Sequence, residues 1–494
     1  MRVRWALQCL AFAAGAAAMA GCSLAPPYKV PTTASPAPSF KELGEWKEAQ
    51  PADAIPRGPW WNIFQDGQLD ALENRVSVSN QNLQAALARL EQARAQTREA
   101  RSAYFPTVTA SASAIRQRQS INSPLYNSTK PPIYNDFTLE ADVSYEFDLF
   151  GRVRNTVAAA RATQQSSAAD LAVLDLATHA ELASDYFMLC SDDTQAVLLD
   201  HTVADYAQAL QLTENLYNGG AAPLSDLEQA RAQLETAKTQ AADIRLSRAQ
   251  LEHAVAVLVG EQASTFHIDL APLKADVVPP ALDPGLPSAL LERRPDVASA
   301  ERLVAAANAQ IGVARAAYFP IFNLSTGSVA TTLAGFQSTS TSNWISAPSR
   351  LWSVGPAGVL TVFDAGLHRA QSAYAHAQYD EHVADYRGAV LTAYQEVEDN
   401  LAALRQLQEE SVSEANAVRA SASALQQAQY RYQGGIVTYL EVVTEENAAL
   451  SAQLSAVSIQ TRRLNASVLL VKALGGGWEN PQATQMQHAA SEAP

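Results

Sequence analysis

Apolar and polar residues alternate without exception from Phe137 to Asp148. The apolar positions are Phe137, Leu139, Ala141, Val143, Tyr145 and Phe147, and four of the six polar positions between them are acidic. Side chains of a strand point alternately to its two faces, so this pattern predicts a strand with one face suited to lipid and one suited to water. Residues 107–114 alternate in the same way with smaller side chains. A soluble hairpin has the same periodicity, so that alternative stays open.

The second half of the chain carries two further strand-like segments with poorer alternation. We expect strands at about 106–118 and 136–148 in the first half, and at about 320–330 and 351–364 in the second half. Pro356 lies inside the last of these, and proline cannot donate a hydrogen bond to a strand ladder. The sequence gives no account of this proline in a barrel wall.

Each half also contains a segment long enough for an unusually long helix. Residues 152–218 contain neither Gly nor Pro, and residues 367–433 contain only Gly388. A continuous helix of this length would reach ~100 Å at 1.5 Å per residue. Leu69, Val76, Leu83 and Leu90 recur every seven residues, beside a row of mostly small residues, which favours helices that supercoil at close range. Such helices indicate a coiled coil or a tube rather than a compact domain.

The chain contains two copies of one arrangement of helices and strands. Four motifs recur at an offset of 214 to 216 residues: Ala95 to Pro106 at Ala309 to Pro320, Phe147-Asp148 at Phe363-Asp364, Tyr217 to Gly220 at Tyr432 to Gly435, and Val259-Gly260 at Leu474-Gly475. We therefore expect a first repeat over 60–271, a proline-rich linker over 272–287 and a second repeat over 288–477. A tail of residues 478–494 follows.

The N-terminus is predicted to be a signal peptide. Arg2 and Arg4 precede a short apolar run, and small residues lead directly to Cys22, as in a bacterial lipobox. This similarity implies cleavage after residue 21 and a covalent lipid on Cys22, followed by an extended segment over 22–59. Ser23 favours sorting to the outer membrane. An ordinary signal peptide with an incidental cysteine is the alternative. Beyond residue 22 only Cys190 remains, so no disulfide can form within the mature chain, and Cys190 is expected to be a small core residue.

Composition and motifs exclude several functions. The net charge of −15 and the lack of a basic tract do not suit a nucleic-acid partner. The eight histidines show no metal-binding spacing, and no glycine-rich phosphate loop occurs. We therefore predict that the protein is not an enzyme and needs no cofactor apart from the lipid. No second apolar run of 18 residues follows the leader, so a membrane span must come from strands.

Four strands cannot close a membrane barrel, because open sheet edges in lipid leave backbone groups unpaired. Known single-chain barrels begin at about eight strands, so at least two chains must share the wall. The predicted fold is mostly helical with a β-barrel portion that several chains complete.

These features resemble the outer membrane efflux protein family of TolC type, and its lipoprotein branch of the OprM and NodT type. The motifs that carry the resemblance are Trp60-Trp61 with Phe64, Asp66 and Leu69; Leu291 through Asp296; the two Tyr-Phe-Pro sites; Phe363-Asp364; and Tyr432 through Leu440. The resemblance implies a homotrimer with a twelve-stranded transmembrane barrel and an α-helical coiled-coil barrel in the periplasm. It also implies an inner-membrane transporter of the resistance-nodulation-division (RND) class and a periplasmic adaptor.

The function implied is an outer-membrane exit channel that passively conducts drugs or other small toxic compounds to the exterior. A duct for type I protein secretion has the same fold, and a structural coiled-coil lipoprotein is a further alternative. The chain alone does not name the exported compounds or the cognate pump.

The Gly-Gly pairs are candidates for a functional end of the molecule. Glycine tolerates positive φ, so Gly219, Gly220, Gly434 and Gly435 are expected to form tight turns between long helices. These turns, at about 218–225 and 433–440, would be the periplasmic tip, opposite the strands.

The candidate gate residues flank these turns: Tyr432 precedes the second turn, whereas Asp226, Glu441, Thr444 and Glu445 follow the turns. Glu441 matches the position where the resemblance implies a lumen-facing carboxylate at the closed end, whereas Thr444 stands where the family often has aspartate. Three symmetry-related carboxylates would attract cations. An exposed helix carboxylate with no gating role is the alternative.

Overall fold

A computed structural model describes residues 23–33, 40–43, 59–122, 124, 129, 132–273, 279, 293–324, 334–353 and 355–476. The predicted signal peptide, Cys22, most of the predicted linker and the C-terminal tail lie outside these residues. The described chain divides into two compact units. Unit 1 comprises the described parts of Met1–Thr32, Arg89–Ala168 and Ser299–Tyr386, and unit 2 comprises those of Thr33–Ala88, Ala169–Ala298 and Arg387–Pro494.

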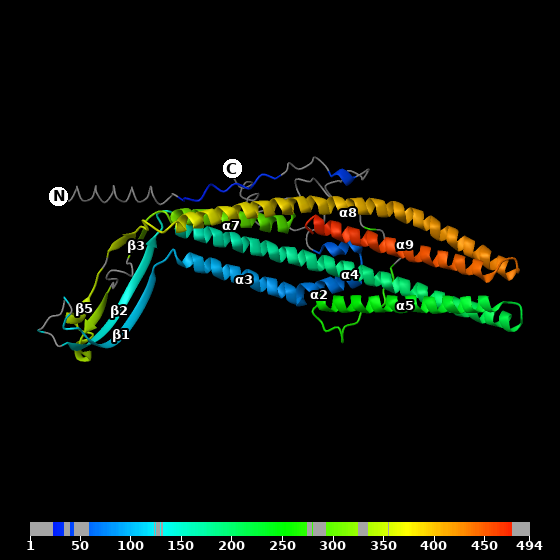
Figure 1. Ribbon diagram of the computed structural model, residues 1–494, viewed down its shortest axis with the longest axis horizontal. Coiled ribbons are helices and arrows are strands. Elements are labelled where there is room, and N and C mark those ends of the chain that lie inside the picture. Colours follow the sequence, from blue (N-terminus) through cyan, green and yellow to red (C-terminus); the bar gives the residue numbers. More distant parts are fainter. Residues whose placement is uncertain are drawn as a thin grey trace. The chain divides into compact units, whose positions relative to one another are not determined.

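Helices make up most of the structure (Figure 1), about 69% of the described residues. The α-helices are α2 (Gly67–Ser79), α3 (Gln81–Ser102), α4 (Arg152–Asn218), α5 (Leu224–Leu258), α7 (Pro295–Ala316), α8 (Leu367–Gln433) and α9 (Tyr439–Ala473). Short 3-10 helices are η1 (Lys41–Leu43), η3 (Trp60–Phe64), η4 (Thr341–Asn343) and η5 (Ala347–Ser349). Among the described residues, no helix combines the length and the apolar character needed to cross a membrane.

The two halves of the chain contain helices of equal length. The long helices α4 and α8 have 67 residues each, and the returning helices α5 and α9 have 35 each. The long helices span the segments that the sequence predicted from their lack of Gly and Pro. Helix α8 continues through Gly388, which is exposed, and a Cβ added there would meet nothing within 4 Å.

The predicted heptad row is buried, but it does not belong to one helix. Leu69, Val76, Leu83 and Leu90 are all at most 7% exposed. Asn80 separates α2 from α3, because its carboxamide oxygen accepts hydrogen bonds from the N–H groups of Asn82 and Leu83 at 2.9 and 3.0 Å. The row therefore continues across a capped break.

A second recurring motif explains how each returning helix ends. Gly260 and Gly475 both have positive φ, at 73° and 89°. A Cβ at Gly260 would lie 2.4 Å from the Ser79 carbonyl oxygen, and one at Gly475 would lie 2.1 Å from that of Arg293. Both repeats therefore place a glycine where two backbones touch, which only glycine allows.

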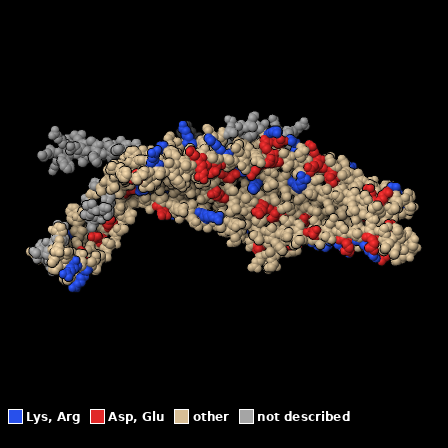
Figure 2. Space-filling view, viewed as in Figure 1, with Lys and Arg blue, Asp and Glu red and all other residues tan. Residues whose placement is uncertain are grey.

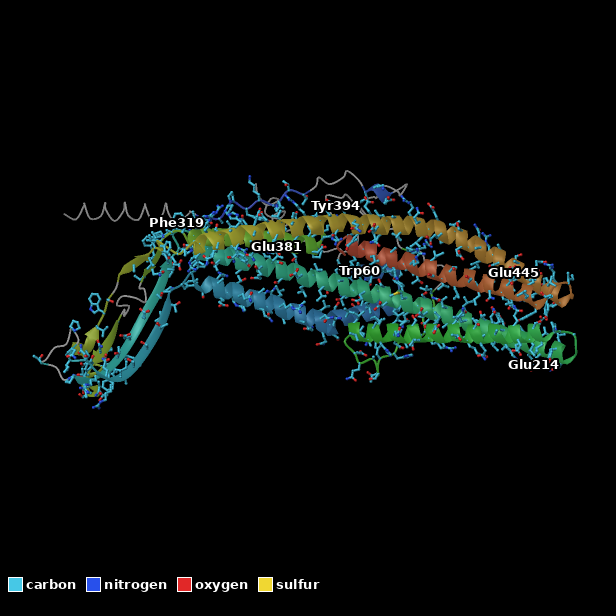
Figure 3. All side chains as sticks on the ribbon, in the orientation of Figure 1. Trp60, Glu214, Phe319, Glu381, Tyr394 and Glu445 are labelled. Carbon is cyan, nitrogen blue, oxygen red and sulfur yellow. The ribbon has the colours of Figure 1, made fainter. Side chains whose placement is uncertain are left out.

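Unit 2 has an aromatic and ionic core. Trp60, labelled in Figure 3, and Trp61 are buried in η3, and the Trp61 ring stacks on His179 at 4.5 Å between centroids. His179 Nδ1 lies 2.5 Å from Glu73 Oε2, and its Nε2 lies 3.2 Å from Ser77 Oγ. Cys190, 3% exposed, lies in this unit as the small core residue that the sequence predicted.

Arg294 links the start of α7 to α8 and α9, the two helices of the second hairpin. Its guanidinium is buried and binds the Asp296 carboxylate at 2.6 and 3.0 Å. It also donates to Glu396 of α8 at 2.6 Å and to the Ala473 carbonyl oxygen at the end of α9 at 3.0 Å. A buried guanidinium is tolerated because its donors are satisfied and opposite charges lie beside it.

Unit 1 contains the strands, which form one antiparallel sheet. They are β1 (Thr107–Arg118), β2 (Ile133–Phe147), β3 (Ile321–Leu324), β4 (Ala334–Ser338), β5 (Arg350–Leu351) and β6 (Pro356–Val359). Strand β2 pairs with β1 on one side and with both β3 and β4 on the other. Strands β6 and β5 then pair with β3 and β4. The sheet therefore has four rows, and β1 lies at one edge.

The register places like residues on the same face. Val108 lies opposite Val143, Ala112 opposite Leu139, and Ala114 opposite Phe137. The polar residues Ser111 and Ser113 lie opposite Glu140 and Thr138. The predicted two-faced alternation is thus continued from strand to strand. Every residue of β1 is exposed in the single chain.

The prediction of a strand through residue 364 is wrong. Strand β5 ends at Leu351 and β6 at Val359. The Asp364 carboxylate accepts backbone hydrogen bonds from Gly366 and His368, both at 2.9 Å, and Ala365 and Gly366 have positive φ. This conformation caps α8 and ends the extended chain. Asp148 caps α4 in the same way through the N–H groups of Val153 and Arg154, so β2 stops at Phe147.

The strands of the second half accommodate Pro356 and are shorter than predicted. Pro356 is the first residue of β6, a position where a missing N–H is tolerated. Strand β3 covers only the start of the predicted 320–330 segment, and residues 325–333 lie outside the described chain.

We predict that Gly260→Ala destabilises unit 2 much more than Gly220→Ala does. Both glycines have nearly equal φ, 73° and 74°, but a Cβ at Gly220 would meet nothing within 4 Å. The two substitutions therefore cause similar backbone strain, but only Gly260→Ala brings a Cβ into collision with another backbone. Gly260→Ala should lower the free energy of unfolding by about 1–3 kcal/mol more than Gly220→Ala does. Chemical denaturation measures the difference, and equal midpoints for the two variants would contradict the close approach.

We also predict that stability falls as pH rises toward 9. Burial raises the pKa of Glu73 to about 7, against the opposing effect of His179. Burial alone would lower the pKa of His179, but its hydrogen bonds with Asp175 and Glu73 outweigh this and raise it to about 9. Both groups hold protons more tightly in the folded state, so unfolding becomes easier as pH rises, by about 2 kcal/mol between pH 6.5 and 9.

The double variant Glu73→Gln, His179→Gln is the control for this pH effect. Its free energy of unfolding should vary less with pH over the same window, whatever its absolute stability. Denaturation curves that show the same pH slope for both proteins would rule out the pair as its source.

Candidate functional site

Two Gly-Gly turns join the long helices to their returns and lie at the same end of unit 2 (Figure 1). In the first, the N–H of Gly219 donates to Asn215 O at 3.0 Å and that of Ala221 to Leu216 O at 2.8 Å. The second repeats this pattern, with the N–H of Ile436 donating to Arg431 O at 2.9 Å. Gly220 and Gly435 have φ of 74° and 69°. The turns are thus Schellman-like reversals that require glycine at the left-handed position.

The candidate carboxylates Asp226 and Glu441 occupy matching places in the first turns of α5 and α9. Their N–H groups donate to Pro223 O at 3.1 Å and to Thr438 O at 3.2 Å. Acidic side chains are favourable there because the helix N-terminus carries a partial positive charge. Helix stability alone therefore accounts for an acid at both positions.

The two hairpins differ in charge pairing. Glu441 forms an ion pair with Arg431 at the end of α8. The residue that matches Arg431 in the first hairpin is Leu216, and Asp226 instead accepts a hydrogen bond from Ser225 Oγ at 3.3 Å. Within one chain, Glu441 is therefore neutralised by a neighbour, so a ring of free carboxylates would require Arg431 to move away.

Tyr432 is fixed by packing rather than left at the surface. It lies against a buried cluster of Ala230, Ala428, Tyr439, Val442 and Val443. Its ring centroid is 5.5 Å from that of Tyr439, and burial raises the pKa of its hydroxyl. This cluster joins residues of α5, α8 and α9, so the two hairpins are packed together close to their turns.

The remaining candidates lie one turn further along α9. Thr444 Oγ donates to the Leu440 carbonyl oxygen at 2.8 Å, a bond within its own helix. Glu445 is half-buried on α9 (Figure 3). The structure thus brings Tyr432 and Glu441 into contacts across the second hairpin, while Thr444 is bonded within its own helix.

Sequence reasoning missed Arg431, Tyr439 and Glu446. Arg431 and Glu441 are ten residues apart on either side of a turn, a spacing that helical periodicity does not connect. Tyr439 and Glu446 are seven apart on α9, so a search for one helix face could have found them together. Among the described residues, no group of three or more His, Cys, Asp or Glu side chains could hold a metal ion.

A family model described as "Outer membrane efflux protein" matches residues 72–261 and 286–476. The chain belongs to the outer membrane efflux protein family. The two matched segments correspond to the two copies of the helix–strand–hairpin design, so the family assignment covers most of the chain.

Named relatives of this family are similar over nearly their full length. The toluene efflux pump outer membrane protein TtgC of Pseudomonas putida is 34% identical over 489 residues, covering 98% of this chain and 99% of the relative. The outer membrane protein OprJ of Pseudomonas aeruginosa is 31% identical over 461 residues, covering 93% and 94%.

Solved structures of family members have the same fold. The outer-membrane channel OprN superposes with a TM-score of 0.84 at 29% identity, covering 93% of this chain and all of OprN. The open state of the MtrE outer membrane channel of Neisseria gonorrhoeae gives 0.76 at 28% identity, covering 93% and 99%. This efflux family member is therefore a TolC-like outer-membrane exit channel of an efflux system.

We predict that the Arg431–Glu441 pair sets the charge beside the second Gly-Gly turn. In planar bilayers, Glu441→Ala should lower cation selectivity by on the order of twofold, because it leaves Arg431 unpaired. Arg431→Ala should raise it, because it leaves Glu441 unpaired. Single-channel conductance and reversal potentials measure both effects.

The matched control is Glu228→Ala, which removes an exposed carboxylate of α5 paired with Arg231. It should leave selectivity unchanged. If neither Glu441→Ala nor Arg431→Ala differs from the parent in conductance or selectivity, Glu441 has no part in a gate.

Proposed function

We propose that three copies of this chain form one duct through the outer membrane, each giving four strands to a twelve-stranded wall. An inner-membrane RND-class transporter and a periplasmic adaptor deliver the cargo, and the duct conducts it passively to the exterior. The long helices extend into the periplasm and end at the Gly-Gly turns.

One observation carries this proposal: the sheet of unit 1 has an apolar face and an unpaired edge. The apolar positions of β1 and β2 share one face through their register. Among the described residues, β1 pairs only with β2, so its outer row of N–H and C=O groups has no strand beside it. Lipid cannot satisfy those groups, so a strand from another copy must do so.

The dimensions of the apolar face fit a membrane. From Phe137 to Phe147 there are ten steps along β2, or ~33 Å at about 3.3 Å per residue. A strand tilted by 40–45° would place this run across about 25 Å, the height of the apolar band of an outer-membrane barrel. Arg116 and Arg118 follow the apolar run of β1, and Figure 2 shows Lys and Arg gathered at the end of the strand region.

The cargo is proposed from the relatives. The relatives in Pseudomonas putida include outer membrane proteins named for antibiotic and toluene efflux pumps. We infer that this duct carries small apolar or amphipathic toxic compounds of the same kind.

Anchoring and gating complete the proposal. A lipid on Cys22 would hold the N-terminus at the membrane, and the duct needs no other cofactor. The Gly219-Gly220 and Gly434-Gly435 turns would form the periplasmic tip, where untwisting of the return helices α5 and α9 opens the channel. The contacts of Tyr432 and Glu441 across the second hairpin support a closed end at this place.

We predict that Ala112→Arg abolishes assembly, whereas Ser111→Arg is tolerated. Both replace small, exposed residues of β1 by the same side chain, and they differ only in the face of the sheet. Arginine on a lipid-facing strand position costs about 2–4 kcal/mol near the bilayer midplane, but much less on the water side. Loss of the heat-resistant trimer from outer-membrane extracts, together with greater antibiotic and toluene sensitivity of a complemented deletion strain, is the expected result for Ala112→Arg.

A soluble sheet would respond differently. If both variants assembled and protected cells equally well, or if the purified parent protein remained monomeric in mild detergent, the shared membrane wall would be wrong. If the parent protein forms trimers but the deletion strain that produces it is as drug-sensitive as the deletion strain alone, the duct would stand and drug export would not be its function.

A further inference from the structure

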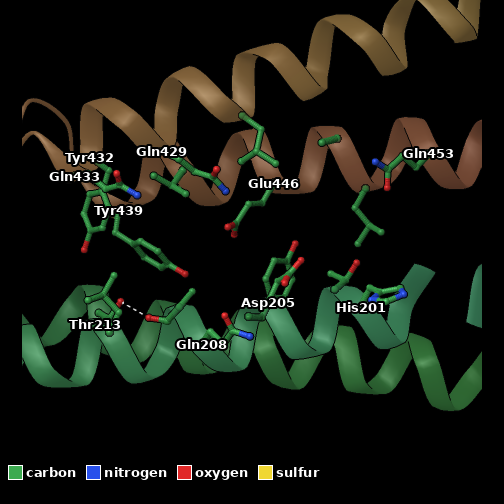
Figure 4. A pocket seen from close by; sticks show the side chains of 18 of the residues that line it. His201, Asp205, Gln208, Thr213, Gln429, Tyr432, Gln433, Tyr439, Glu446 and Gln453 are labelled. Atoms are coloured by element: carbon green, nitrogen blue, oxygen red, sulfur yellow. Dashed lines mark hydrogen bonds between the residues drawn. The ribbon is translucent and has the colours of Figure 1, made fainter. Parts of the chain in front are cut away.

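A cavity of about 780 Å³ lies between α4, α8 and α9 in unit 2 (Figure 4). Its volume is in the range of small-molecule sites. Helix α4 contributes His201, Asp205 and Tyr206 to its lining, α8 contributes Tyr432, and α9 contributes Tyr439 and Glu446. Side chains from both hairpins therefore line a half-open space, in which His201 and Asp205 are exposed and Glu446 is half-buried.

Glu446 points into this cavity from α9 (Figure 4). Its Oε2 atom is buried and has no hydrogen-bond partner among the described residues. The carboxylate of Asp205 enters the same space from α4 (Figure 4). Among the described residues, neither carboxylate has a Lys or Arg in ion-pair contact, and the cavity lining contains neither residue type. An uncompensated carboxylate in a low-dielectric site is costly unless a positive charge or a proton joins it.

Aromatic side chains complete the surroundings. Tyr206 and Tyr439 are 4% and 3% exposed, and the buried Tyr206 hydroxyl oxygen has no hydrogen-bond partner among the described residues. The Tyr432 and Tyr439 rings lie 5.5 Å apart at 55°. Burial raises the pKa of all three hydroxyl groups, so they stay neutral. Neutral phenol rings attract cations through their π-faces.

We propose that this cavity binds an organic cation, an amine or a quaternary ammonium or phosphonium compound of drug size. Glu446 and Asp205 supply the opposite charge, and the tyrosines supply an apolar, cation-attracting wall. A small inorganic cation fits less well, because a hard ion would need more oxygen ligands than two carboxylates give. The site lies within one chain, so its occupancy does not depend on the proposed trimer or on the cargo of the duct.

Proton binding should compete with cation binding. Burial first, and then the charge of Asp205, raise the pKa of Glu446 to about 7. The other titratable groups that face it are His201 and Tyr206 from α4, Tyr432 from α8 and Tyr439 from α9, with Asp226 of α5 acting on Tyr432 and Tyr439. Since Glu446 loses its proton as pH rises through 7, affinity for the cation should increase from pH 6 to pH 8.

The test measures tetraphenylphosphonium binding to the full mature protein by equilibrium dialysis, with tetraphenylborate as an anion of the same shape. Glu446→Gln and, separately, Asp205→Asn should each weaken tetraphenylphosphonium binding at least about tenfold, or ~1.4 kcal/mol. Glu214→Gln removes a carboxylate of the same helix α4 that pairs with Arg231 at 3.8 Å outside the cavity, and it should bind like the parent. The parent should bind the cation more tightly at pH 8 than at pH 6.

Each other result overturns the proposal. Equal binding of tetraphenylborate would indicate simple partition into apolar surface or detergent. Equal weakening by Glu214→Gln would indicate a general effect of surface charge. If Glu446→Gln does not fold, Asp205→Asn decides the matter alone, and parent-like affinity in that variant would leave Glu446 as a site for a proton only.

Discussion

Unpaired backbone at a sheet edge is the constraint on which the rest of this molecule depends. Unit 1 offers a single-layered sheet with an apolar face, and the described residues provide neither a second layer nor a strand beside the outer edge of β1. In water the apolar face is unstable, and in lipid the edge is unstable. The proposed wall completed by further copies would remove both problems at once, whereas the helical hairpins pack within one chain.

The two repeats meet the same backbone requirements with the same residues. Gly260 and Gly475 allow a helix end to touch another backbone, Asp148 and Asp364 cap the helix that follows a strand, and glycine closes both turns. They differ where charge matters, because Arg431 pairs with Glu441 and Leu216 stands in the matching place. Two hairpins with one backbone plan thus present different electrostatics at the same end of unit 2.

Several buried charged groups of unit 2 lie beside a group that offsets their charge. Arg294 is surrounded by Asp296 and Glu396, Asp193 is bonded to Arg248 at 2.6 Å, and Glu73 shares a hydrogen bond with His179. Each of these groups has a partner that offsets its loss of water. Glu446 has none among the described residues, although it lies beside a cavity and a second carboxylate. Asp192, 8% exposed, also has an Oδ2 atom without a partner among the described residues, so what distinguishes Glu446 is its place beside the cavity and a second carboxylate.

The sequence by itself determined the elements and their order. The absence of Pro and the near absence of Gly placed the long helices, strict alternation placed β2, and recurring motifs revealed the two repeats, because each of these signals can be read along one chain. Local caps at Asn80 and Asp364 break the heptad row and end the extended chain after β6, which alternation and heptad spacing did not reveal. Tertiary structure decided how the two hairpins contact each other near their turns. It also paired Arg431 with Glu441 and placed Glu446 opposite Asp205. Those outcomes depend on which side chains meet across helices, and no periodicity in a single sequence encodes such distances.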